Sequence, residues 1–395
     1  MAVDASVADA RRKAEEIGMW ADEPLRIQED HVDGLLLWCV LRRTTDVSIQ
    51  TDRPVYIEVD GVLFPITRRA IDSADMANVL SKIYGPDALA KLASGRDLDL
   101  SYEVRPDRNT RYRFRVNITA ILSRGRDSVQ ITMRSLPNLP PTMAELGIEE
   151  KIVDNWAQRQ GLILITGPTG SGKSTLLAAG NRMLIEREQG CGKMLSYEAP
   201  IEYVYDQILG ERSLVAQTEI PKHLPDFAAG VRNALRRKPN IIMVGEARDR
   251  ETVSAAIEAG QTGHAVYSTA HTVGVAATIR RMVSVFEPSE RSERAFALME
   301  TLRMIVTQAL VPRVGGGRVG LREYMVFDEN VREIMLDMAI ERWTSEAQRL
   351  LVRYGKTMEQ SATAAYKAGL IERRWYLMLT KGFSGEEREV QESFE

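Results

Sequence analysis

The stretch from Gly161 to Thr175, GLILITGPTGSGKST, constrains the fold more than any other part of this chain. Four apolar residues, Leu162 to Ile165, lead into a glycine-rich run that matches the phosphate-loop pattern G-x-x-x-x-G-K-[ST]. A short apolar run of this kind predicts a buried parallel strand, and Leu176 to Met183 after the loop predicts a helix. The sequence therefore indicates an α/β domain that binds a nucleoside triphosphate.

The glycines of this loop allow successive backbone N–H groups to turn toward one point, where they and the helix N-terminus can bind phosphate oxygens. Lys173 is expected to reach the β- and γ-phosphates, and the Ser174 hydroxyl to coordinate the Mg²⁺ that accompanies the nucleotide. The predicted nucleotide-binding residues are Gly167, Pro168, Thr169, Gly170, Ser171, Gly172, Lys173, Ser174 and Thr175.

The bulk properties exclude several classes of protein. The chain has 395 residues, enough for two domains or more, and a formal net charge of −3, which argues against a basic surface for nucleic acid. Its two cysteines, Cys39 and Cys191, lie far apart, which fits a reducing cytoplasm. The N-terminus lacks the apolar core of a signal peptide, and the longest apolar run, Leu35 to Leu41, is too short to span a bilayer. We therefore expect a cytoplasmic protein that reaches a membrane only through partners.

Composition shifts along the chain predict its domain organisation. Residues 1–34 are expected to form an N-terminal extension, a polar helix whose most helix-prone part is Asp9–Glu16 and then a loop, and residues 35–136 a smaller α+β domain. Pro137 to Thr142, PNLPPT, is the clearest linker. Residues 143–330 are expected to form the phosphate-loop domain, and residues 331–395 a helical C-terminal region.

The smaller domain contains one strand with a distinctive face. In Arg111 to Ile118, RYRFRVNI, strict alternation places three arginines and Asn117 on one face and apolar residues on the other. Two interpretations stay open: a solvated strand face, or arginines that reach the triphosphate of a neighbouring subunit, as an arginine finger does. The candidates for the second interpretation are Arg113, Arg124 and Arg134.

After the linker, predicted strands and helices alternate, which is typical of a doubly wound parallel sheet. Ser289 to Leu310 is predicted to be one long amphipathic helix, followed by a turn at Gly315–Gly317. The predicted strands are Leu162–Thr166, Lys193–Tyr197, Ile241–Val244 and Ala265–Thr269, and the predicted helices between them include Phe227–Lys238 and Glu251–Ala259.

Polar residues follow or flank three of these strands, and ligands of open α/β sheets bind at the carboxyl ends of the strands. Glu198 and Glu202 follow one strand, Glu246 follows another, and His264 and His271 bracket the last. Carboxylates here can orient an attacking water, and the histidines are expected to contact the γ-phosphate. Each has a plainer interpretation: Glu246 as a helix cap, the other glutamates as surface charges, and the histidines as structural.

Taken together, GPTGSGKST, YEAPIEY, IIMVGEARD and TGHAVYSTAHT resemble, in order and spacing, the hexameric traffic ATPases of type IV pili and of type II and type IV secretion. RYRFRVN and ELGIEEKI are similar to the PilT-like subgroup. Within it, HLPDFAAGVRNALRRKPNIIMVGEARD and VGLREYMVFDENVREIML resemble the DotB-like ATPases of type IVB secretion and the TraJ-like ATPases of conjugative plasmids. The resemblance covers roughly residues 40 to 330.

This resemblance implies a RecA-like ATPase domain with ATP and Mg²⁺ as ligands, a PAS-like N-terminal domain, and a homohexamer docked on inner-membrane components of the secretion complex. It implies that Glu198 and Glu202 polarise the attacking water, that Glu246 is the Walker B glutamate, and that arginines act on the adjacent subunit. The chain departs from most relatives at Ala199, where they have an aspartate. With no carboxylate at this position, the role of polarising water is expected to fall to Glu198 and Glu202.

Three other interpretations remain at this point. A pilus retraction motor is the same class of enzyme attached to a different machine. A RecA-like nucleic-acid motor predicts basic grooves with stacking aromatic residues, whereas aromatic residues make up only 6% of this chain. A GTP switch is disfavoured because the chain lacks an Asn-Lys-x-Asp motif, and a small-molecule kinase is disfavoured because it would not explain the two histidines that bracket one strand.

Overall fold

The computed structural model describes residues 17–42, 44–59, 62–108 and 110–380. The chain divides into two compact units. The first comprises residues 1–138 together with 199–203, and the second comprises residues 139–198 and 204–395. The division after Asn138 falls inside the predicted linker, and the segment 199–203 joins the first unit although both of its neighbours in sequence belong to the second.

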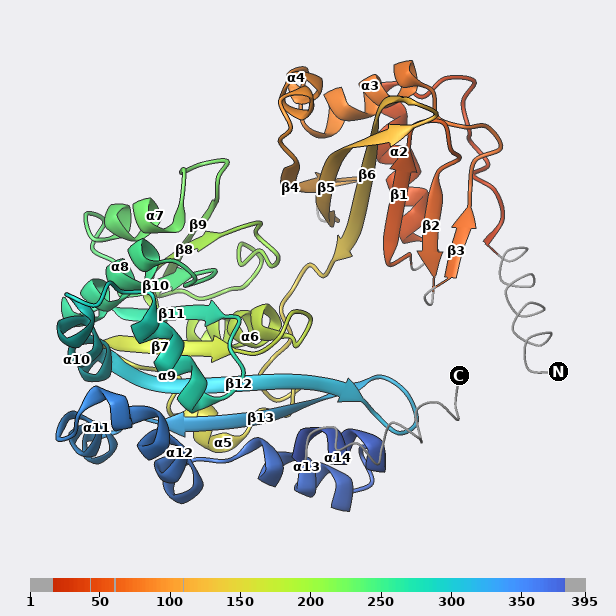
Figure 1. The fold of residues 1–395 in the computed structure, drawn as a ribbon. Coiled ribbons are helices and arrows are strands. Elements are labelled where there is room, and N and C mark those ends of the chain that lie inside the picture. The colour runs from red at the N-terminus through yellow and green to blue at the C-terminus, as the bar shows by residue number, and fades with distance from the viewer. Residues whose placement is uncertain (1–16, 43, 60–61, 109, 381–395) are drawn as a thin grey trace. The chain divides into compact units, whose positions relative to one another are not determined.

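The first unit contains a six-stranded antiparallel sheet with helices packed against it, as the prediction of an α+β domain requires (Figure 1). Spatial strand order is β3-β2-β1-β6-β5-β4. The elements are α2 (Glu29–Val40), β1 (Asp46–Gln50), β2 (Tyr56–Val59), β3 (Val62–Pro65), α3 (Ser73–Ile83), α4 (Ala88–Ala93), β4 (Leu98–Val104), β5 (Tyr112–Ser123) and β6 (Arg126–Leu136).

The core of the first unit begins earlier than the sequence predicts. Trp20, Ile27 and Val32 are buried in the same hydrophobic cluster as the strands of the sheet. The predicted boundary between an extension and the domain at residue 34 is therefore wrong, because it falls inside helix α2. The glycine at the centre of α2, Gly34, weakens the helical pattern on which a sequence-based boundary depends. The helix predicted at Asp9–Glu16 lies outside the described residues.

The second unit is built on a seven-stranded sheet in the order β13-β12-β7-β11-β10-β8-β9 (Figure 1). All neighbouring strands are parallel except β12 and β13. The strands are β7 (Gly161–Thr166), β8 (Gly192–Glu198), β9 (Ser213–Glu219), β10 (Ile241–Val244), β11 (Ala265–Ala270), β12 (Leu302–Pro312) and β13 (Arg318–Val326). The helices among them are α5 (Glu150–Asp154), α6 (Lys173–Glu186), α7 (Phe227–Ala234), α8 (Arg250–Gln261), α9 (Val275–Ser284) and α10 (Arg291–Thr301).

Helices cover both faces of this sheet. Val266 of β11 packs into the cluster that includes α8 and α9. The next residue, Tyr267, points to the opposite face because side chains alternate along a strand. Its ring lies 5.7 Å from that of Trp156, and α6 approaches Trp156 at Gly180, where a Cβ atom would lie 2.0 Å from the indole. This arrangement confirms the predicted RecA-like, doubly wound fold.

The prediction of one helix over Ser289–Leu310 is wrong in its second half. Helix α10 ends at Thr301, and the chain then forms β12, which pairs with β7 on one side and with β13 on the other. The segment LRMIVTQAL contains residues common in helices, so its periodicity does not separate the two structures. The predicted glycine turn is the hairpin between β12 and β13, where Gly315, Gly316 and Gly317 all have positive φ.

The C-terminal region is helical, as predicted, but it is part of the second unit. Trp343, Leu350 and Leu351 belong to the same hydrophobic cluster as the sheet, and Tyr324 of β13 forms a β-bridge with Lys356. The region contains α11 (Glu329–Leu336), α12 (Trp343–Tyr354), α13 (Met358–Lys367) and α14 (Arg373–Thr380).

Candidate nucleotide-binding site

The glycine-rich loop joins the carboxyl end of β7 to the N-terminus of α6. Gly167, Gly170 and Gly172 have φ of 139°, 77° and 80°, in the region that favours glycine. Helix α6 begins at Lys173 and has no acidic residue in its first turn. Lys173 Nζ donates hydrogen bonds of 2.9 Å to the carbonyl oxygens of Gly167 and Pro168. The ammonium group therefore lies against the concave side of the loop.

The loop has the features that a phosphate group requires. Ser171 Oγ is buried without a hydrogen-bond partner among the described residues, so it has an unused donor. A Cβ atom at Gly170 would meet no atom within 4 Å, which leaves the loop open to a ligand there. Backbone amides at a helix N-terminus, one lysine and the Ser174 hydroxyl form the donor set of a magnesium–nucleotide site. These residues fit the predicted ligands.

Strand order determines which side chains can reach this loop. Strands β11, β10 and β8 follow β7 in the sheet, so their carboxyl ends lie roughly 5, 10 and 14 Å from that of β7. These ends carry His271, Glu246 and Glu198 respectively. A single line of polar groups therefore runs along the carboxyl edge of the sheet, away from the phosphate loop.

His271 connects the loop to Glu246. Its Nδ1 lies 3.5 Å from Thr169 Oγ1, and its Nε2 lies 3.9 Å from Glu246 Oε1. The side chains of His271 and Glu246 are 47% and 27% exposed, so both can meet a ligand. The structure thus brings together the loop, the predicted histidine and the predicted Walker B glutamate.

His264 occupies the other end of β11. Its carbonyl oxygen accepts a hydrogen bond from Gly161 N at the start of β7, and its Nδ1 lies 3.1 Å from the carbonyl oxygen of Ala259. A strand of six residues separates it from the phosphate loop, a distance of about 20 Å. The prediction that both histidines contact the γ-phosphate is therefore wrong for His264 within one chain, because residues that bracket a strand lie at opposite edges of the sheet.

Glu198 is the last residue of β8 and is buried. Its Oε1 accepts hydrogen bonds from Ser196 Oγ at 2.7 Å and from Gln217 Nε2 at 2.9 Å. Gln217 in turn accepts from the backbone N–H of Tyr205 through its Oε1. This network holds the carboxylate in one orientation at the carboxyl edge of the sheet.

Glu202 belongs to the segment 199–203 of the first unit, where two arginines of β5 contact it. Arg113 donates to the carbonyl oxygens of Glu202, at 2.7 Å, and Ile201. Arg115 Nη1 lies 3.5 Å from Glu202 Oε1. The predicted arginine face is therefore not a uniformly exposed one, since Arg111 and Arg113 are buried. The role of Glu202 in polarising water remains a prediction.

The three candidate arginines do not form one cluster. Arg124 is exposed at the turn between β5 and β6, and Arg113 lies near the other end of this hairpin, roughly 35 Å away. Arg134 of β6 is exposed, and its Nε lies 3.0 Å from Asp46 Oδ1. Their proximity in sequence is misleading because a hairpin places its turn far from its ends. One phosphate group cannot be reached by Arg113 and Arg124 of the same chain.

Two hydrogen bonds, one to the loop and one to the residue that makes it, were not expected from the sequence. Gln308 of β12 donates from Nε2 to the carbonyl oxygen of Ser171 at 2.7 Å, and Arg322 of β13 donates from Nε to Gln308 Oε1 at 2.9 Å. The prediction of a helix over Ser289–Leu310 concealed the contact made by Gln308. With the strand register known, Gln308 follows Thr307, which pairs with Thr166 directly before the loop.

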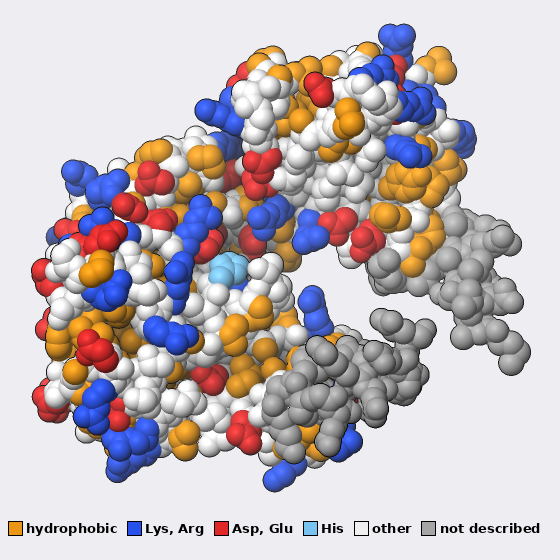
Figure 2. All heavy atoms as spheres, in the orientation of Figure 1, with side chains coloured by type: hydrophobic (Ala, Val, Ile, Leu, Met, Phe, Trp, Pro, Cys, Tyr) orange, Lys and Arg blue, Asp and Glu red, His pale blue; other side chains and the backbone are white. Residues whose placement is uncertain are grey.

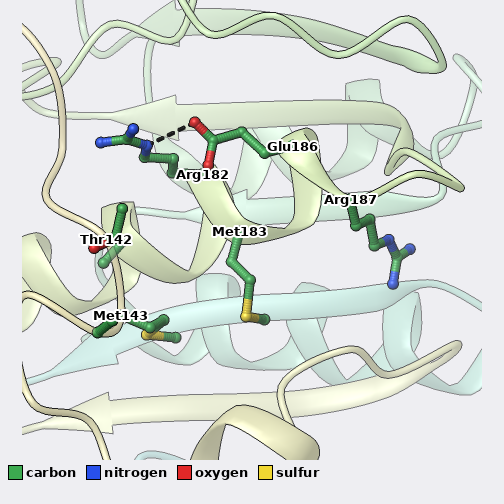
Figure 3. Close-up of a pocket in the computed structure, with 8 residues that line it drawn as sticks. Thr142, Met143, Arg182, Met183, Glu186 and Arg187 are labelled. Atoms are coloured by element: carbon green, nitrogen blue, oxygen red, sulfur yellow. Dashed lines mark hydrogen bonds and ion pairs between the residues drawn. The ribbon is translucent and has the colours of Figure 1, made fainter.

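A cavity of about 390 Å³ lies beside the second half of α6 (Figure 3). Arg182 borders it, pairs with Glu186 at 2.8 Å, and donates to the carbonyl oxygen of Pro140 at 2.7 Å. Met143 and Met183 line its apolar part. The helix that begins at the phosphate loop is thereby bonded to the end of the predicted linker.

In the parts of the chain that the structure describes, no helix combines the length and hydrophobicity needed to cross a membrane.

Comparison with known proteins identifies the family. Residues 48–371 match the family model described as Type II/IV secretion system protein. The type IV pilus retraction ATPase PilT of Pseudomonas aeruginosa is 32% identical over 342 residues, which cover 87% of this chain and 96% of PilT. The crystal structure of the ATPase DotB of Legionella pneumophila is 46% identical, with a TM-score of 0.87, over 91% of this chain and 98% of that chain. The structure of the pilus retraction motor PilT with bound ADP is 30% identical, with a TM-score of 0.77, over 93% and 100% of the two chains.

With its phosphate loop, its RecA-like sheet and these similarities, the chain belongs to the type II/IV secretion system protein family, among the PilT-like traffic ATPases.

Proposed function

We propose that this protein hydrolyses ATP and that its homohexamers power a type IVB secretion or conjugative transfer apparatus. The observation that carries the proposal is the similarity to DotB, at 46% identity and a TM-score of 0.87, against 30% and 0.77 for the PilT structure. The conjugative alternative rests on sequence motifs alone, since the stretches that resemble DotB-like ATPases also resemble the TraJ-like ATPases. The protein would act in the cytoplasm, docked on inner-membrane components of the apparatus.

The geometry supports a specific division of labour in hydrolysis. Mg²⁺ bound with the nucleotide would neutralise charge on the phosphate oxygens, with Ser174 as its protein ligand. Glu246 would orient the attacking water, and Glu198, held by Ser196 and Gln217, would support it. His271 lies between Thr169 and Glu246, where it would sense whether the γ-phosphate is present.

Arginines from an adjacent subunit would complete the site. Arg124 and Arg134 are exposed and are the candidates for reaching a neighbouring nucleotide. Arg113 is instead occupied by carbonyl oxygens of its own chain. An arginine finger supplied by another subunit raises kcat by about 10³–10⁵-fold. Hydrolysis would therefore depend on hexamer assembly.

Steady-state ATPase assays on the purified protein test the enzymatic part of the proposal. The wild-type protein should hydrolyse ATP, and Lys173→Ala should reduce the rate to background. Sizing with and without a non-hydrolysable ATP analogue should show a hexamer under at least one condition. Equal rates for wild type and Lys173→Ala would refute the proposal.

Genetic complementation distinguishes a type IVB secretion ATPase from a pilus retraction motor. We expect the gene for this protein to restore transport in Legionella pneumophila lacking DotB, and not twitching motility in Pseudomonas aeruginosa lacking PilT. A pilus retraction motor is the alternative function, favoured by the 32% identity to PilT over 96% of its length. Restored twitching without restored transport would favour that alternative.

A nucleic-acid motor has less support. The face in Figure 2 shows basic and acidic side chains interspersed over the described residues, without a continuous basic surface. The net charge of −3 gives no general attraction for phosphate backbones. ATPase activity should therefore not respond to added single-stranded or double-stranded DNA.

A further inference from the structure

Gln308 packs under the phosphate loop at three positions. Its Nε2 donates to the carbonyl oxygen of Ser171. A Cβ atom at Gly167 would lie 2.3 Å from the backbone oxygen of Gln308, and one at Gly172 would lie 2.9 Å from its Nε2. These two positions are therefore glycines for a second reason besides their positive φ, since Gln308 occupies the space that a side chain would need.

The bond to Ser171 fixes the direction of a neighbouring amide. In a planar trans peptide, the C=O of one residue and the N–H of the next point in opposite directions. Because Gln308 holds the Ser171 carbonyl on the side of β12, the N–H of Gly172 must point away from β12. One donor of the phosphate nest is thus aimed by a side chain that does not contact the nucleotide.

Arg322 fixes the other end of the Gln308 amide, which determines which way the amide faces. Its Nε donates to Gln308 Oε1, so the oxygen side is bound and the NH₂ group must face Ser171. Arg322 is buried and is held by Glu149 Oε2 at 3.1 Å and by the carbonyl oxygens of Leu146 and Gly147, each at 3.1 Å. Burial lowers the pKa of the Arg322 guanidinium, and the nearby Glu149 carboxylate opposes this.

We propose that Gln308 is a positioning residue for the nucleotide and that Arg322 orients it, so that this buried pair determines the affinity of the phosphate loop. The proposal concerns the same nucleotide site as the proposed function. Glu149 extends the chain of contacts, because its second oxygen accepts from Lys356 Nζ at 2.9 Å. Loop geometry is thereby tied to the segment after the linker and to the C-terminal region.

The test removes the hydrogen-bond donor that Gln308 offers to Ser171 and keeps the acceptor that it offers to Arg322. In Gln308→Glu the side chain keeps its size and its acceptor for Arg322, whose charge keeps the carboxylate ionised, but it presents an oxygen to the Ser171 carbonyl. We expect the Kd for fluorescently labelled ADP to rise at least tenfold, while the circular dichroism spectrum of the nucleotide-free variant stays that of the folded wild-type protein. Gln308→Met, which loses both bonds at similar volume, should raise the Kd three- to tenfold.

Asp75→Asn is the control for destabilisation alone, since it removes the charge of a buried carboxylate that pairs with the partly exposed Arg69 in the other unit. It should lower the melting temperature and leave the Kd unchanged. Wild-type affinity in Gln308→Glu, or in Gln308→Met if the first variant does not fold, would overturn the proposal. So would an equal loss of affinity in Asp75→Asn. Nucleotide binding is measured without turnover, so this result stands apart from whether the wild-type protein hydrolyses ATP.

Discussion

His271 lies between the phosphate loop and Glu246, with its two ring nitrogens 3.5 Å from Thr169 Oγ1 and 3.9 Å from Glu246 Oε1. A single imidazole therefore contacts both the loop and the carboxylate proposed to orient water. Because β11 lies between β7 and β10 in the sheet, a side chain that follows β11 is placed between the loop and Glu246.

The two histidines that bracket β11 should differ in effect. We expect His271→Ala to lower kcat for ATP by about 10²-fold, since it removes the group between loop and glutamate. His264→Ala should leave kcat within about threefold and lower the free energy of unfolding by about 1 kcal/mol, because its ring bonds the end of α8. Steady-state kinetics and urea unfolding of both variants check this, and equal losses of kcat would contradict it.

Much of this site can be predicted from sequence because it lies at the ends of short strands that are largely apolar and fully buried. The runs before Gly167, Glu246 and Ala270 are buried along their whole length, and each ends in polar residues. The edge strand β9 escapes this reasoning because its SLVAQTE alternates weakly and is half-buried. Burial of Arg113 could not be predicted either, since alternation assigns a residue to a face but not what covers that face.

Substitution of Arg113 tests whether this residue acts within its own chain or on the nucleotide of a neighbouring subunit. Because its guanidinium binds the carbonyl oxygens of Ile201 and Glu202, we expect Arg113→Ala to lower ATPase activity by loosening the segment 199–203 of the same chain. Mixing Arg113→Ala subunits with Glu246→Gln subunits should then restore no activity. Recovery above the sum of the two variants would show that Arg113 acts on the neighbour's nucleotide. Arg124→Ala, tested in the same mixtures, should show such recovery if it supplies the finger.

Two loop glycines should tolerate alanine to different degrees. Gly170→Ala meets no neighbouring atom, so its cost is the left-handed backbone alone, about 1–2 kcal/mol. Gly167→Ala adds a collision with the backbone oxygen of Gln308, which cannot move without disturbing β12. Calorimetry with ADP should show weakened binding for the first variant and none for the second. Comparable binding by both would contradict the close approach of β12.

The ionisation of Asp75 should make the stability of the first unit depend on pH in the acid range. Burial alone would raise the pKa of this carboxyl group, but hydrogen bonds from Arg69 and from the backbone N–H groups of Ile27 and Asp72 outweigh it and lower the pKa below 3.8. A lowered folded-state pKa means that the stabilisation is complete above the unfolded pKa and is lost as the pH falls through the folded one. Asp75→Asn should therefore lower the free energy of unfolding by about 2 kcal/mol at pH 7, and the difference from wild type should shrink below pH 3.8. Urea unfolding at pH 7 and pH 3 measures both, and a constant difference would contradict the assignment.

The most direct test of the account is single-turnover hydrolysis of ATP by Glu246→Gln, with ATP affinity measured on the same preparation. If the strand-end groups converge on one triphosphate, this variant binds ATP as tightly as the wild-type protein and hydrolyses it at least 100-fold more slowly. Hydrolysis at the wild-type rate would show that Glu246 does not act on the nucleotide held by the phosphate loop.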